Sequence, residues 1–177
     1  MSDTWQTDGP DPREANGTPR GEKQCVLDYL RAYRLTLQMK CEGLDADQLA
    51  RRSVPPSSLS LLGLVRHLAK VEHSWARRCL EGADVERLYS TDEEPDADFD
   101  GAVADDAVVA EAWESWHREV THAEQVHAGL DDLAELVGWK GEELEVRDVL
   151  VHLVEEYARH VGHADLLREC VDGRTGQ

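Results

Sequence analysis

The fold is decided by residues 146–171, which read VRDVLVHLVEEYARHVGHADLLRECV. Hydrophobic positions recur here in alternating steps of three and four, the spacing of the buried stripe on a helix that packs against other helices. The stripe consists of Leu150, Leu153, Tyr157, His160, Ala164, Leu167 and Val171. Because His160 belongs to it, we expect the His160 imidazole to point into the protein.

Two further ionisable residues share the face of His160. Glu156 lies one turn before it and His163 almost one turn after it, so that a carboxylate and two imidazoles point toward the same neighbouring helix. A buried charge needs a partner. Carboxylate oxygen and imidazole nitrogen are ligands of zinc and related ions, so a divalent cation suits this group.

Three other stretches of the chain repeat with the period of a helix. We expect helices from Glu22 to about residue 43, from about 59 to 80 and from about 107 to 128, besides the last one, which should end near residue 173. A glycine stands just past the end of each, at positions 43, 82, 129 and 173. No segment alternates as a strand does. The sequence therefore predicts an all-α protein, a four-helix bundle over residues 22–173.

The segments outside and between these helices are polar. Residues 1–21 mix Gly, Pro, Asp and Thr without periodicity, which predicts a flexible N-terminal arm, and residues 174–177 form a short tail. Residues 84–106 are strongly acidic and predict a long loop that wraps the helices. Residues 130–145 are mixed in character and are interpreted as a linker.

Composition excludes several classes of partner. The chain of 177 residues has 37 acidic and 19 basic residues and a net charge of −18, so it should repel nucleic acid and anionic membrane surfaces. No apolar run approaches the length of a membrane span or of a secretion signal. The four cysteines are scattered without a paired motif, which favours free thiols. A cytoplasmic location is expected.

The second helix supplies a third candidate ligand for the cation. His67 stands beside Leu64 and Leu68 of the hydrophobic stripe, at the edge of the buried face. With Glu156 and His160 it would give two nitrogens and one oxygen, which leaves a coordination position for water or substrate, as in a catalytic site. The alternative is that each of these side chains is a hydrogen-bonded core residue without a metal.

Other polar residues near this predicted site have open roles. His152 lies one turn before Glu156 and either packs or supports the site, and His163 is either a direct ligand or a group behind the ligands. Three arginines flank these positions and either form solvated salt bridges or bind an anionic substrate or cofactor. They are Arg66, Arg159 and Arg168.

Two motifs together resemble a known family. Residues 53–72, SVPPSSLSLLGLVRHLAKVE, and residues 149–169, VLVHLVEEYARHVGHADLLRE, look like the DinB-like superfamily of metal-binding four-helix bundles (DinB/YfiT-like), and within it the actinobacterial DUF664 group. The resemblance covers about residues 21–173. It implies a divalent metal bound by one histidine of the second helix and a pair four residues apart on the fourth, positions matched here by His67, Glu156 and His160.

The motif departs from the usual pattern at two positions. Most DinB-like bundles carry histidine where this chain has Glu156, although the mycothiol-dependent maleylpyruvate isomerase branch is similar in using glutamate. His163 stands where many members carry glutamine, which leaves its place in the coordination sphere open.

The resemblance implies a metal-dependent thiol transferase. In such enzymes a metal, zinc here with nickel, manganese or iron as alternatives, binds a low-molecular-weight thiol and lowers its pKa, so that the thiolate attacks a small electrophile, as in detoxification. Mycothiol is the expected co-substrate and bacillithiol the alternative. The expected catalytic residues are Glu156, His163 and His152, the histidines moving protons.

Two other functions remain open at this stage. One is a metal-dependent isomerase or hydrolase acting at the same residues. The other is a stress-linked metal-binding bundle without turnover. The oligomeric state is expected to be monomer or homodimer.

Overall fold

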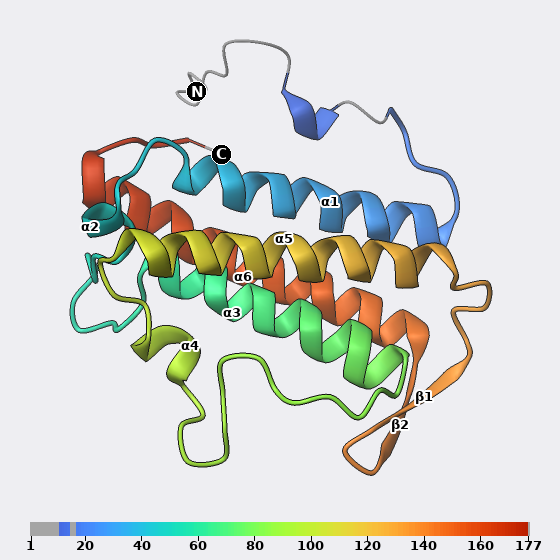
Figure 1. Ribbon diagram of the computed structural model, residues 1–177. Helices are drawn as coiled ribbons and strands as arrows, with labels where there is room; N and C mark the ends of the chain where they lie inside the picture. Colours follow the sequence, from blue (N-terminus) through green and yellow to red (C-terminus); the bar gives the residue numbers. More distant parts are fainter. Residues whose placement is uncertain (1–10, 15–16, 177) are drawn as a thin grey trace.

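Long helices dominate the protein (Figure 1). The computed structural model describes residues 11–14 and 17–176. Within these residues, the long helical segments are α1 (Glu22–Cys41), α3 (Leu61–His73) continued by the π-helix η2 (Ser74–Leu80), α5 (Asp106–Ala128) and α6 (Val146–Asp172). The mostly helical class predicted from the sequence is confirmed, and the helix boundaries agree with the predicted ones to within a few residues.

The long helices pack side by side around one hydrophobic core. α3 packs mainly on α5, α1 packs mainly on α6, and α3 also contacts α6. All but one residue of the predicted stripe on α6 are buried, namely Leu150, Leu153, Tyr157, His160, Ala164 and Leu167. This packing brings the middle of α6 against the middle of α3, where His67 lies.

Short elements occupy the connections. They are η1 (Pro12–Glu14), α2 (Ala46–Leu49) and α4 (Ala97–Asp100). The helix α2 begins with a capping box, in which the Asp45 side chain accepts from the Gln48 backbone and the Gln48 side chain accepts from the Asp45 backbone. The helix α4 lies inside the acidic segment that was predicted to be a loop, and it packs on α3.

A short β-hairpin lies in the segment that was interpreted as a linker, residues 130–145. Strands β1 (Leu136–Trp139) and β2 (Glu142–Glu145) pair antiparallel just before α6. Lys140 and Gly141 form the two-residue turn, both with positive φ, 53° and 90°, the backbone that twists a tight hairpin correctly. The strands are four residues each, too short to show a clear alternation in the sequence.

Parts of the predicted ends lie outside the described residues. These are residues 1–10 and 15–16 of the predicted arm and residue 177 of the predicted tail, so the division into arm, bundle and tail stays a prediction. Residues 12 and 13 pack against α1, because Arg31 of α1 donates hydrogen bonds to the carbonyls of Pro12 and Arg13.

Two further expectations concern cysteines and membrane spans. Cys25, Cys41, Cys79 and Cys170 are free thiols, as expected. Among the described helices, none combines the length and the apolar character needed to cross a lipid bilayer.

Candidate metal centre

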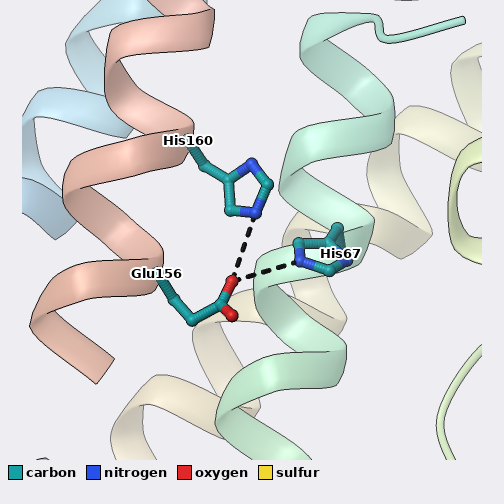
Figure 2. A group of neighbouring side chains, drawn as sticks. All are labelled: His67, Glu156 and His160. Carbon is teal, nitrogen blue, oxygen red and sulfur yellow. Dashed lines mark ion pairs between the residues drawn. The ribbon is translucent and has the colours of Figure 1, made fainter. Parts of the chain in front are cut away.

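Three side chains from two helices converge between α3 and α6. His67 extends from α3, and Glu156 and His160 extend from successive turns of α6 toward it (Figure 2). Each offers one ligand atom, and these atoms lie within 4.8 Å of one another. The structure thus brings together the three residues that the sequence predicted as a metal-binding group.

Glu156 lies between the two imidazoles. Its Oε2 is 3.2 Å from His160 Nε2 and 3.6 Å from His67 Nε2. The rings of His67 and His160 meet edge to face with centroids 4.5 Å apart. Two nitrogens and one carboxylate oxygen therefore face a common point, with the four-residue spacing on α6 placing Glu156 and His160 one above the other.

A buried carboxylate fixes the orientation of His67. Asp98, in α4, is fully buried, and its Oδ2 lies 2.8 Å from His67 Nδ1 and 2.6 Å from Lys70 Nζ. An ionised carboxylate only accepts hydrogen bonds, so Nδ1 carries the proton and donates it. The lone pair of the neutral His67 ring is therefore at Nε2, the atom that faces Glu156 and His160.

His67 Nε2 is the atom that tests whether a metal fits here. It is buried and has no hydrogen-bond partner among the described residues, and buried polar atoms are nearly always paired. A carboxylate behind the imidazole and a nitrogen without a hydrogen bond in front of it are the arrangement of a histidine metal ligand. The donor set of two imidazoles and one carboxylate therefore fits a divalent cation such as zinc.

The pKa values of the cluster follow from its charges. The neighbouring imidazoles of His160 and His67 hold the pKa of Glu156 well below its usual range. Burial disfavours the charged form of His67, but the carboxylates of Asp98 and Glu156 outweigh burial and raise its pKa. Without a metal, the cluster consequently holds a proton on His67 more readily than a free imidazole would.

The close approach of α4 to α3 positions Asp98. Phe99 stacks on the His67 ring, with centroids 4.9 Å apart and the planes at 21°. A Cβ at Gly63 would lie 3.1 Å from the Phe99 ring, and a Cβ at Gly101 would lie 2.7 Å from Arg66 Nη2. Glycines at these two positions let the short helix pack directly against the face of α3 on which His67 lies.

His152 borders the cluster on the side of the hairpin. Its Nε2 is 3.4 Å from Glu156 Oε1, and its side chain is 36% exposed. The ring contacts Trp75, with centroids 4.6 Å apart, and Trp75 in turn contacts Trp139 of β1. His152 is therefore a partly exposed imidazole beside Glu156.

His163 lies behind His160. Its Nδ1 is 3.4 Å from His160 Nδ1, whereas Glu156 faces the other nitrogen of the His160 ring. Burial, followed by the neighbouring His160 and Arg159, lowers the pKa of His163. This position favours a residue that orients His160 over a direct ligand.

The three arginines predicted as binding residues have separate environments. Arg66 donates to the carbonyls of Asp98 and Ala97 and holds α4. Arg168 is buried and donates to carbonyls at the end of α1. Arg159 is exposed and pairs with Glu155. The contacts of Arg66 and Arg168 favour structural roles, and only Arg159 presents its charge to solvent.

Sequence reasoning missed Asp98. It lies 31 residues beyond His67 in the chain, in a segment whose many acidic residues gave no reason to single it out. The one available signal was the short sequence ADFD after Pro95 and Asp96, which is compatible with a turn of helix.

One known family covers most of the chain. Residues 25–173 match the model of the mycothiol-S-transferase family. The chain belongs to this family. The match confirms the resemblance to DinB-like proteins, and it spans all three residues of the cluster. No curated protein matches the chain.

Proposed function

We propose that this member of the mycothiol-S-transferase family transfers a low-molecular-weight thiol, mycothiol, to a small electrophile at a divalent metal centre. The proposal is supported by the family match and by the cluster of His67, Glu156 and His160. The single observation that supports a metal is the position of His67 Nε2: it is buried, has no hydrogen bond within the described residues and lies 3.6 Å from Glu156 Oε2.

The metal would supply one kind of chemistry. A bound divalent cation stabilises the thiolate, which is the nucleophilic form of a thiol. Zinc suits two nitrogens and one oxygen with an open position, and nickel, manganese and iron are alternatives.

The protein's own residues would prepare the site. Asp98 keeps the proton of His67 on Nδ1 and so directs Nε2 toward the ligand position. Glu156 contributes a negative charge that partly offsets the cation, and its lowered pKa keeps it ionised. His163 orients His160.

A proton has to leave the thiol before the thiolate attacks. His152 is the nearest partly exposed imidazole to Glu156 and is placed to accept that proton and pass it to solvent. The sulfur then forms a bond to an electrophilic carbon, and the leaving group departs with the bonding electrons. With monochlorobimane as electrophile, the products are the bimane thioether, chloride and a proton.

The test measures thiol-dependent loss of monochlorobimane by purified zinc-loaded protein. We expect mycothiol to be consumed with it in equal amounts, and His67→Ala and His160→Ala each to abolish stoichiometric metal binding and turnover. His163→Ala should only weaken metal binding, and His117→Ala, at an exposed position, is the matched control.

Two outcomes would redirect the assignment. Metal-dependent turnover of a small acid without any thiol would indicate an isomerase or hydrolase, and stoichiometric metal without turnover of either kind would indicate a binding protein. Equal metal loss from His163→Ala would make His163 a direct ligand.

A further inference from the structure

A cleft between α1 and α5 is separate from the metal cluster and shares no residue with it. Its volume is about 410 Å³, within the range of small-molecule sites. Figure 1 shows the two helices next to each other, α1 in blue and α5 in yellow to orange. The lining includes Lys23, Leu27, Asp28, Arg31 and Arg34 of α1 and Glu124 and His127 of α5.

His127 is the unusual residue of this cleft. It lies in the last turn of α5 and is 1% exposed. Neither of its ring nitrogens has a hydrogen-bond partner among the described residues. A buried imidazole in a native structure is normally paired, so its partner is expected to come from the cleft that it lines.

The charges around His127 indicate whether that partner should be an anion or a cation. Burial, and then the cations Arg34 and Lys23, lower the pKa of His127 to about 3. The ring is therefore neutral at physiological pH and offers one N–H donor. Asp28 and Glu124 also line the cleft, but the cations Arg34 and Lys23 are the charges that act on the ring itself, and they favour an anionic group beside it.

Arg34 provides a second donor. Its Nε and Nη2 both donate to the buried carboxylate of Glu72, each at 2.8 Å. Its Nη1 faces Glu124 Oε1 at 3.6 Å, and the Glu124 side chain is 58% exposed. A ligand oxygen that enters the cleft would compete with this solvent-exposed carboxylate for Nη1.

The remaining cations of the cleft already donate to backbone carbonyls. Lys23 donates to Ala128 and Leu130, and Arg31 donates to Pro12. They contribute positive charge but few further donors. One imidazole N–H and one guanidinium N–H match the two oxygens of a carboxylate, whereas a phosphate would demand more donors.

We propose that the cleft between α1 and α5 binds a small organic carboxylate, with one oxygen accepting from His127 and the other from Arg34 Nη1. The apolar body of the ligand would pack on Leu27, which lines the same cleft. This site is independent of the thiol-transfer proposal and holds whether or not the metal cluster is catalytic.

The test uses the full-length protein and benzoate as the probe. Histidine side-chain nitrogens are followed by NMR during the titration, and we expect the His127 signals to shift saturably. Benzamide has nearly the same shape but no charge. It should bind at least about tenfold more weakly than benzoate, a difference of about 1.4 kcal/mol or more. No saturable shift, or equal affinity for benzamide, would overturn the proposal.

Three variants make the test specific. His127→Phe should lose benzoate binding, and His122→Phe, on the same helix but paired with Glu81, should keep it. Glu124→Gln removes the competing carboxylate at an exposed position and should bind benzoate more tightly. Unchanged affinity in His127→Phe, or unchanged or weaker affinity in Glu124→Gln, would contradict the proposed contacts, and thermal melting establishes that each variant is folded.

Discussion

At the scale of single residues, the ring nitrogen of His67 that carries the proton is set by Asp98, a residue of another helix. Asp98 accepts a hydrogen bond from the Nδ1–H group of His67 and also forms an ion pair with Lys70. Both hydrogen bonds outweigh the effect of burial and lower the pKa of Asp98, so it stays ionised. In the proposed metal centre Asp98 would be a positioning residue, because it would act on the metal through His67.

Replacing Asp98 tests this role. Asp98→Asn keeps the shape but removes the charge, so we expect metal affinity to fall about 10–100-fold, the usual cost of losing such a partner. Competition with a metal indicator measures the change. Asp100→Asn, with a side chain that is 71% exposed, is the control, and unchanged affinity in Asp98→Asn would remove Asp98 from the site.

The raised pKa of His67 predicts how metal affinity depends on pH. A proton on Nε2 blocks coordination, and the carboxylates that raise the His67 pKa above 6.5 strengthen that proton's hold. Metal affinity should therefore fall as pH drops through the raised pKa and level off only above it. Indicator titrations over a series of pH values measure this, and an affinity independent of pH through this region would contradict it.

The raised pKa of His67 has the opposite effect on the stability of the metal-free protein: this stability falls, rather than rises, with increasing pH. A pKa that is higher in the folded protein than in the unfolded chain stabilises the fold at pH below the unfolded value of 6.5, and this contribution is lost as pH rises through the folded pKa. We therefore expect a bound metal to stabilise the protein most at pH values above the folded pKa of His67, where the proton no longer contributes.

At the scale of elements, the short helix α4 matters more than its length suggests. It carries Asp98 and Phe99 to the face of α3 on which His67 lies, and Arg66 of α3 donates a hydrogen bond to the Asp98 carbonyl. The contact leaves no room at Gly101, where a Cβ would lie 2.8 Å from the Ala97 carbonyl oxygen. Backbone has to move if a side chain is added there.

Gly101→Ala is expected to displace α4 without unfolding the long helices. Asp98 would then lose its alignment with His67, and metal affinity should fall about tenfold while the helical circular dichroism stays the same. Gly138→Ala is the matched control, because a Cβ there has nothing within 4 Å. Loss of helicity, or full metal affinity, would show that α4 does not act in this way.

At the scale of the whole molecule, one buried network joins all the long helices. Arg34 of α1 pairs with Glu72 of α3, which also accepts from the Tyr157 hydroxyl of α6 at 2.7 Å. Trp116 of α5 donates to the same hydroxyl at 3.0 Å. Each helix contributes one member, so the network fixes the relative positions of helices that apolar packing alone leaves less defined.

Tyr157→Phe should lower the free energy of unfolding by about 1–3 kcal/mol, because the indole N–H of Trp116 loses its buried acceptor. Urea denaturation of the metal-free protein measures this. Tyr29→Phe is the control, since Tyr29 is 58% exposed and should change stability little. A Tyr157→Phe variant as stable as the parent would mean that the network contributes no net stability.

The sequence by itself determined the helices and the identity of the three clustered residues. The period of Leu150, Leu153 and Tyr157 is local information, and so is the one-turn spacing of Glu156 and His160. That His67 faces them followed from its place on the second stripe together with the family resemblance.

Only the tertiary structure decided what surrounds those residues. Asp98, the pair of strands that carries Trp139, and the unpaired imidazole of His127 acquire their roles from segments distant in the chain. A helix repeats every few residues and so is visible in the sequence, but a contact between remote segments depends on how the helices pack and where the connecting chain crosses them, and no local pattern encodes that.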